Sequence, residues 1–194
     1  MIDSDREKKL KTIRKPLQNA RKTNDFKKEL TRGVLQGEFG VTDGNDAIPI
    51  LGTFGAGPCL IVAIYESEKK SAFLTHIDAS TCLDSFDREL SKLNYNPITS
   101  QVHLYGGDSS SHDMCMDVYD IIENKGFVIV NSDIVREETD SASFAIDARN
   151  GNVYSNVNSN DLDTPNIDAR LTCRGLMAAG GMTGVSKIYD SRIN

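Results

Sequence analysis

A threonine, a cysteine and a histidine stand close together in the segment from Leu51 to His76. Thr53 and Cys59 flank a turn that contains two glycines and Pro58, and His76 follows after two apolar runs separated by a charged turn. A thiol beside an imidazole is the minimum apparatus for nucleophilic attack on a carbonyl carbon, because the imidazole can take the thiol proton. These residues are therefore the candidate catalytic group.

The segments around this group predict how it is positioned. The apolar runs 60–65 and 71–77, joined by the charged turn 66–70, predict a β-hairpin. A hairpin returns the chain antiparallel to itself, so we expect His76 to lie beside Cys59. The glycines of the preceding turn allow backbone conformations that are closed to other residues and a close approach to a substrate.

The rest of the chain predicts a mixture of helices and strands. One amphipathic helix is expected after Thr81 as its N-cap, and a second is expected from Ser109 to a stop at Gly126. Extended segments are expected over residues 33–39, 47–54, 98–105 and 127–131, and in a closing hairpin over 143–157 with a two-residue turn at Asn150–Gly151. Residues 159–194 are expected to be loop-like. This mixture predicts an α+β fold with mixed, largely antiparallel β-sheets and helices on one face.

The remaining cysteines and histidines give weaker signals. Buried packing is the usual role of a single cysteine, and this interpretation is favoured for Cys82, Cys115 and Cys173. His103 alternates with apolar neighbours in a predicted strand and His112 opens a predicted helix, so both are expected to be structural or exposed. No His–Cys spacing is typical of a zinc site. We therefore expect no metal and no cofactor.

Composition bounds the class of protein. The chain has 194 residues, 39% of them hydrophobic, with a net charge of −6. It has no apolar run near the roughly 20 residues that span a bilayer, no Sec-type leader and no CxxC pair. These features predict a soluble cytoplasmic protein with reduced thiols and no membrane span, although secretion as an effector without a Sec signal stays open.

The N-terminal segment differs in charge from the rest of the chain. Residues 1–33 carry 11 Lys/Arg and 5 Asp/Glu, whereas the remainder is acidic. A capping box from Ser4 to Glu7 and a break at Pro16 predict two short helices here. A basic arm can bind nucleic acid, an anionic membrane or an acidic partner, but the favoured interpretation is an arm lying on its own acidic domain. Its single aromatic residue, Phe26, argues against a base-stacking surface.

The pattern T-x-G-x-G-x-C, followed by an apolar strand and a histidine that ends the next strand, resembles the chemoreceptor glutamine deamidases of the CheD family. Related bacterial toxin deamidases share its catalytic geometry. The resemblance continues, in matching order, through Gly37–Glu38, Val102–Asp108, Gly126–Asp133 and Ser143–Val153. It covers residues 33–157 and implies a deamidase domain with an α/β/β sandwich there. A basic helical N-terminal arm over residues 1–32 and a C-terminal extension over 158–194 lie outside the resemblance.

The resemblance also implies roles for three residues. Cys59 would be the nucleophile, His76 the base and Thr53 the residue that orients His76. The reaction would hydrolyse a glutamine side-chain amide to glutamate and ammonia through a thioester. The substrate would be a protein with an exposed glutamine, either a bacterial chemoreceptor or a host protein. Two alternatives remain: a non-catalytic module that binds a signalling partner, and a Cys-dependent peptidase or transferase.

Overall fold

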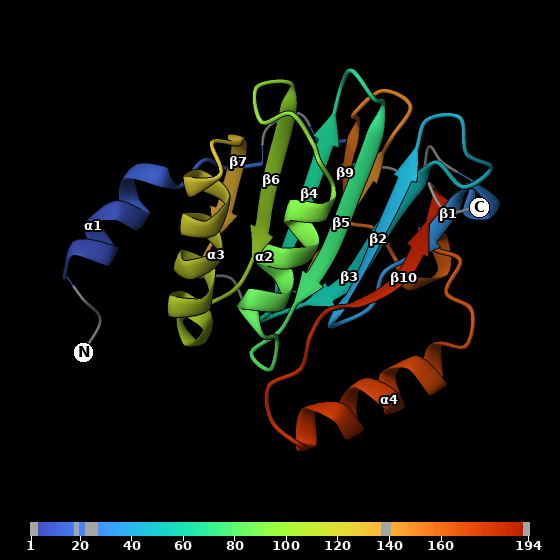
Figure 1. Cartoon of the computed structure of the whole chain (residues 1–194). Coiled ribbons are helices and arrows are strands. Elements are labelled where there is room, and N and C mark those ends of the chain that lie inside the picture. Colours follow the sequence, from blue (N-terminus) through green and yellow to red (C-terminus); the bar gives the residue numbers. More distant parts are fainter. Residues whose placement is uncertain (1–3, 18–19, 22–26, 137–140, 192–194) are drawn as a thin grey trace.

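A computed structural model describes residues 4–17, 20–21, 27–136 and 141–191. Within these residues, two β-sheets pack face to face and helices cover the outer face of the larger sheet (Figure 1). The larger sheet has six strands in the order β10-β2-β5-β4-β6-β7, and the smaller has four in the order β1-β3-β8-β9. The predicted α+β fold with α/β/β layers is confirmed.

The central strands of the larger sheet run antiparallel, and its two edge strands run parallel to their neighbours. Its strands are β2 (Glu38–Asp43), β4 (Leu60–Glu66), β5 (Ser71–Ile77), β6 (Ser100–Gly106), β7 (Val128–Ile134) and β10 (Ser186–Asp190). The smaller sheet consists of β1 (Thr31–Gly33), β3 (Ile50–Ala56), β8 (Ala142–Asp147) and β9 (Val153–Ser155). The predicted hairpin is present as β4 and β5, with Ile61 directly opposite His76.

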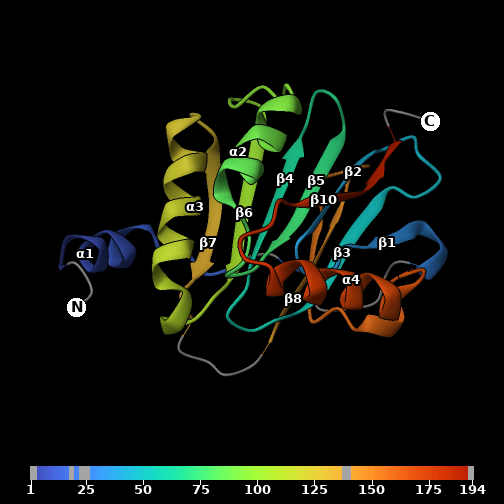
Figure 2. The same cartoon turned by 60° about the horizontal axis from the view of Figure 1, so that its bottom comes forward.

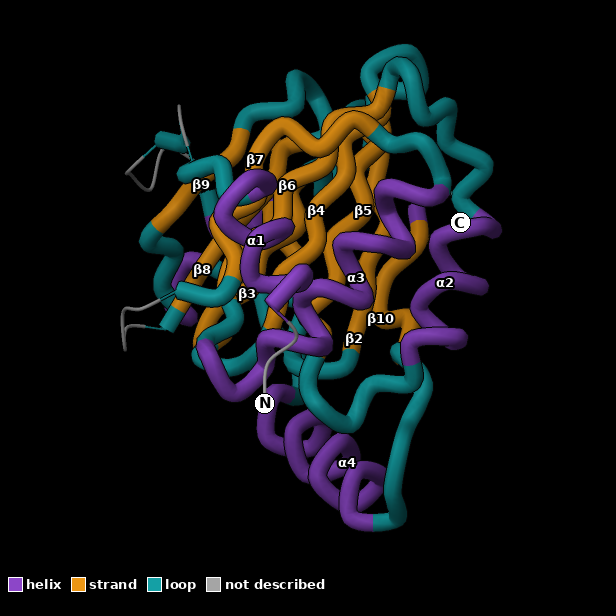
Figure 3. The backbone as a smooth tube through the Cα atoms, turned by 90° about the vertical axis from the view of Figure 1, so that its left-hand side faces the viewer, coloured by secondary structure: helices purple, strands orange, loops and turns teal. Residues whose placement is uncertain are grey.

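Strand β4 is apolar from Leu60 to Tyr65 because both of its faces are buried. Successive side chains of a strand point to opposite faces. Leu60, Val62 and Ile64 pack under helices α2 (Leu83–Lys92) and α3 (His112–Asn124), which lie over the same sheet in Figures 1 and 3. Ile61 and Ala63 point to the other side and pack against the smaller sheet. The unbroken apolar run is thus the pattern of a strand between two cores.

The first helix, α1 (Ser4–Ile13), lies against α3 through charge pairs. Arg6 binds Asp117 at 2.7 Å, and Lys9 binds Asp120 at 2.6 Å. The favoured interpretation of a basic arm lying on its own acidic domain is confirmed for this helix.

The prediction of a second short helix after Pro16 is wrong for the described residues. The chain is extended there, with Lys15 in an antiparallel bridge to Ser132 and Arg21 in a parallel bridge to Tyr154. Residues 18–19 and 22–26 of the expected helix lie outside the described residues. The arm then ends in a 3₁₀ turn, Lys28–Leu30.

The C-terminal segment is more regular than the sequence suggested. Beyond a 3₁₀ turn at Ser159–Asp161, it forms helix α4 (Ile167–Ala179) and strand β10, so the loop prediction for residues 159–194 is wrong. The only buried residue of α4 is Arg174, and an inner face without an apolar stripe gives no helical periodicity to detect. Figure 2 shows α4 at the edge of the sandwich.

Two smaller expectations are also corrected. Thr81 does not cap α2, because its hydroxyl donates to Asp78 at 2.9 Å, and Cys82 is the N-cap residue without a side-chain cap. The turn of the closing hairpin is longer than two residues, since the N–H of Asp147 donates to the carbonyl of Asn152 around residues 148–151. None of the helices in the described part of the chain is long and apolar enough to cross a membrane.

Candidate active site

The three candidate residues converge where the two sheets meet. Thr53 lies in β3 of the smaller sheet, Cys59 directly precedes β4, and His76 is the penultimate residue of β5. Their exposed fractions are 0%, 7% and 3%. His76 is paired with Ile61, which is two residues beyond Cys59, so the thiol and the imidazole are on the same face of the larger sheet. That face packs against β3 and β8.

A hydrogen bond between the sheets fixes the imidazole. Thr53 Oγ1 lies 2.8 Å from Nδ1 of His76. The other ring nitrogen, Nε2, is buried and has no hydrogen-bond partner among the described residues. Cys59 is a diagonal neighbour of His76 across the hairpin, a relation that places Cβ atoms about 7 Å apart. The two side chains therefore share a face without being hydrogen-bonded to each other.

Burial holds both groups in their neutral forms. It raises the pKa of the Cys59 thiol to about 11, with a further contribution from the negative charge of Asp78. Burial also lowers the pKa of His76 to about 4, although Asp78 acts in the opposite direction. At neutral pH the resting site thus contains a thiol and a neutral imidazole, not a thiolate–imidazolium pair.

The turn before Cys59 is open to solvent. Gly55 has a φ of +74°, and a Cβ added at Gly55 or Gly57 would meet no atom within 4 Å. The N–H of Gly57 donates to the carbonyl of Gly55, and Pro58 has no N–H. The N–H of Cys59 is therefore the donor from this turn that can meet an oxyanion.

A buried ion pair beside this group was missed by sequence reasoning. Asp78, two residues beyond His76, accepts from Arg174 of α4, with Nε to Oδ2 at 2.9 Å and Nη2 to Oδ1 at 2.5 Å. Burial alone would raise the pKa of Asp78, but hydrogen bonds from Arg174, Ser80 and Thr81 lower it to about 2. Asp78 is therefore ionised, and its negative charge acts on the thiol of Cys59.

The signal for this ion pair was the spacing of two arginines on α4. Arg170 and Arg174 are four residues apart, so they lie on one face of the helix. Arg170 forms the companion pair with Glu38, at 2.9 Å and 2.5 Å. The expected strand 33–39 is interrupted at Gly37, whose φ is +74°, and a Cβ there would lie 2.2 Å from the guanidinium carbon of Arg174. Glu38 thus binds Arg170, and the absence of a side chain at Gly37 leaves space for Arg174.

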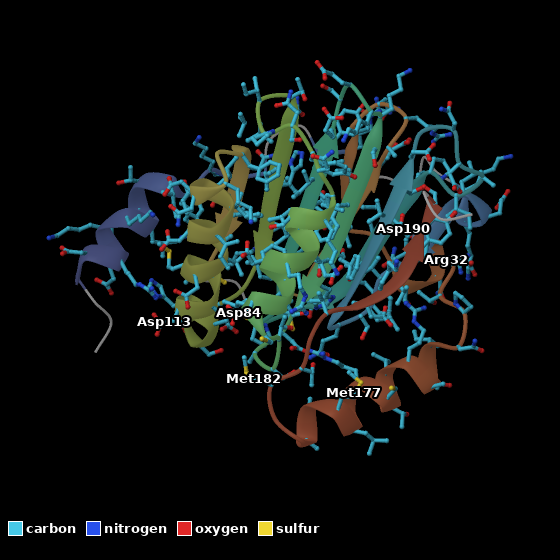
Figure 4. The ribbon with its side chains drawn as sticks, viewed as in Figure 1. Arg32, Asp84, Asp113, Met177, Met182 and Asp190 are labelled. Carbon is cyan, nitrogen blue, oxygen red and sulfur yellow. The ribbon has the colours of Figure 1, made fainter. Side chains whose placement is uncertain are left out.

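A pocket lies between the loop after β5 and helix α4. Its volume is about 420 Å³, and its lining residues are Gln36, Asp78, Ala79, Ser80, Leu171, Arg174, Gly175 and Ala178. Helix α4 and the chain that follows it expose Leu176, Met177 and Met182. Figure 4 labels both methionines close to α4. This pocket gives open space directly beside Asp78.

The other cysteines and histidines lie outside this group. Cys115 is buried in α3 as expected, but Cys82 is half-buried and Cys173 is exposed on α4, so buried packing is wrong for these two. His103 and His112 are both buried. Nδ1 of His103 is 2.8 Å from the side-chain amide of Asn131. Among the described residues, no cluster of three or more His, Cys, Asp or Glu side chains can hold a metal ion.

Compared with known proteins, the chain matches no model of a protein family and no curated protein. What the site can do is therefore inferred from its own residues.

Proposed function

We propose that this protein is a cysteine-dependent amidohydrolase that converts the side-chain amide of a protein glutamine to glutamate and ammonia. The observation that carries the proposal is the hydrogen bond between Thr53 and Nδ1 of His76. If Nδ1–H donates to the threonine oxygen, Nε2 carries a lone pair, and this nitrogen has no partner on the face that it shares with Cys59. An imidazole fixed at one nitrogen can accept and return a proton at the other.

The first half of the reaction forms a thioester. The Cys59 sulfur attacks the carboxamide carbon while its proton passes to Nε2 of His76, because the raised thiol pKa leaves little thiolate at neutral pH. The carbonyl oxygen becomes an oxyanion, and the N–H of Cys59 is placed to donate to it. When the intermediate collapses, the C–N bond breaks and the imidazolium returns the proton to the departing ammonia.

The second half of the reaction consumes water. Nε2 of His76 takes a proton from a water molecule as the oxygen attacks the thioester carbon. The C–S bond breaks, the sulfur recovers the proton, and glutamate is released. The net change is one amide and one water converted to one carboxylate and one ammonium, with no cofactor.

A peptide assay tests this proposal. Peptides with a glutamine or an asparagine, internal or terminal, are incubated with the protein, and released ammonia and peptide mass are followed. We expect ammonia together with a mass gain of about 1 Da on an uncut peptide, since a cut peptide would indicate a peptidase. Cys59→Ser should abolish the release, whereas Cys173→Ser, a change of an exposed thiol on α4, should not. Equal activity in wild type and Cys59→Ser would remove the proposal.

The substrate protein is a second part of the proposal. The sequence resemblance supports two classes, bacterial chemoreceptors met in the cytoplasm and host proteins met after secretion. To distinguish the two classes, a bacterial and a host protein extract are each incubated with wild type and with Cys59→Ser. The glutamines that only the wild type deamidates identify the substrate class.

The second candidate function is a non-catalytic module that binds a signalling partner. One observation favours it: burial raises the pKa of the Cys59 thiol to about 11. Iodoacetamide separates the two functions. Alkylation of Cys59 at neutral pH that a glutamine peptide slows, because its carboxamide occupies the sulfur, supports catalysis, whereas a thiol that stays inert supports the binding module.

A further inference from the structure

Helix α4 is attached to the body by charge. Arg170 and Arg174 point inward, with side-chain exposed fractions of 17% and 8%, while Leu176 is 73% exposed on the outside. A buried ion pair adds little net stability compared with apolar residues of the same volume. Apolar residues at both positions 78 and 174 would anchor the helix as well, so the buried ion pair calls for another explanation.

Asp78 supplies that explanation. The last pair of the β4–β5 hairpin is Leu60 with Ile77, so Cys59 and Asp78 are the residues that flank this pair at the same end of the hairpin. Asp78 is only 4% exposed, so water does little to screen its charge from the thiol. A carboxylate near a thiol disfavours the thiolate.

The charged groups around the thiol differ in sign. Burial is the largest cause of the raised pKa of Cys59. The carboxylates of Asp78 and Asp108 raise this pKa further, whereas the guanidinium of Arg174 lowers it. Arg174 is therefore the favourable charge in an otherwise unfavourable set.

The donors of Arg174 are already used within the protein. Beyond Asp78, the guanidinium donates to the hydroxyls of Ser80, Thr81 and Thr183 and to the carbonyl of Gly184. Such a group acts on the site through its neighbours instead of binding substrate.

We infer that Arg174 of the C-terminal helix is a positioning residue of the candidate site: by pairing with Asp78, it cancels a negative charge at the end of the hairpin that carries Cys59 and fixes the loop that follows His76. This inference rests on the proposed function, because it takes Cys59 as the nucleophile. It makes the C-terminal extension a component of the site and not an appendage.

The rate at which iodoacetamide alkylates Cys59 tests the inference. This rate is measured by peptide mass spectrometry, from neutral pH to the highest pH at which the protein stays folded. Arg174→Gln leaves Asp78 uncompensated, and we expect about tenfold slower alkylation at a given pH, the equivalent of one pKa unit. Arg170→Gln is the matched control, because it breaks the companion pair with Glu38 and leaves Asp78 paired. It should alkylate at the wild-type rate. The double variant Arg174→Gln/Asp78→Asn removes both charges and should restore that rate.

Three outcomes would overturn the inference: equal slowing in Arg170→Gln and Arg174→Gln, which would make both arginines simple anchors; an unchanged rate in Arg174→Gln; or a double variant that remains slow. If Arg174→Gln fails to fold, Asp78→Asn is compared with the double variant, and the presence of Arg174 must then speed alkylation. Ammonia release is measured in parallel. Its absence in wild type removes the proposed function alone, whereas ammonia release without the alkylation contrast removes this inference alone.

Discussion

Gly37→Ala is expected to destabilise the protein far more than the loss of one glycine should. Gly37 has a φ of +74°, a conformation that costs an alanine about 1–2 kcal/mol. In addition, the new Cβ would lie 2.2 Å from both Cζ and Nε of Arg174. Something must shift, and the backbone of Gly37 is held by its hydrogen bond to the carbonyl of His76.

The side chain of Arg174 must therefore give way. An arginine tip in solvent would move at little cost, but this one is bound to both oxygens of Asp78 and to neighbouring hydroxyls. Displacing it leaves a buried carboxylate unpaired, a change worth about 3–5 kcal/mol. Together with the backbone strain, Gly37→Ala should cost about 4–7 kcal/mol.

Gly126 offers the matched control. Its φ is +78°, and an added Cβ would meet only the Cβ of Pro97, at 4.0 Å. Gly126→Ala should therefore lose only the backbone strain, about 1–2 kcal/mol. The free energy of unfolding of both variants is measured by urea titration with far-UV circular dichroism. Equal losses in the two variants would refute the placement of Arg174 over Gly37, and with it the attachment of α4 described above.

Further predictions concern the imidazoles and the arm. Thr53→Val should leave Nδ1 of His76 unpaired and cost about 1–3 kcal/mol in urea titrations, while Thr53→Ser stays near wild type; equal stability of the two would contradict the hydrogen bond. Burial lowers the pKa of His76 and of His103 from 6.5 to about 4, so the unfolded chain takes up protons first, and stability present above pH 6.5 is lost as the pH falls toward about 4. His103→Gln should make the free energy of unfolding depend less on pH in this range. An unchanged pH dependence would contradict the burial of His103. The pairs between α1 and α3 are partly exposed, with Arg6 at 35% and Asp117 at 45%, so about 1 M salt should speed amide exchange in α1 and not in α3; equal protection with and without salt would show that other contacts hold α1.

Local patterns predicted the elements whose partners are near in sequence. The β4–β5 hairpin carries continuous apolar runs because both of its faces are buried, and α2 and α3 each carry an apolar periodicity that matches their buried face. Helix α4 carries no such pattern, because it is bound through Arg170 and Arg174 instead of an apolar stripe. Their partners, Glu38 and Asp78, are 132 and 96 residues away in the chain, a separation that no local window spans. Thr81 illustrates the same limit. Its hydroxyl donates a hydrogen bond to Asp78, whereas the pattern predicted that it would cap the following helix.

By itself, the sequence determined that a short hairpin brings His76 back beside Cys59. That relation follows from two apolar runs joined by a charged turn, and both are properties of neighbouring residues. Only the tertiary structure decided the ionisation of this pair, because the pKa of each group depends on what covers it. The smaller sheet buries the thiol and the imidazole, and the C-terminal helix brings a guanidinium to the carboxylate beside them. Electrostatic interactions act through space with a strength set by burial, so no pattern along the chain could have given their balance.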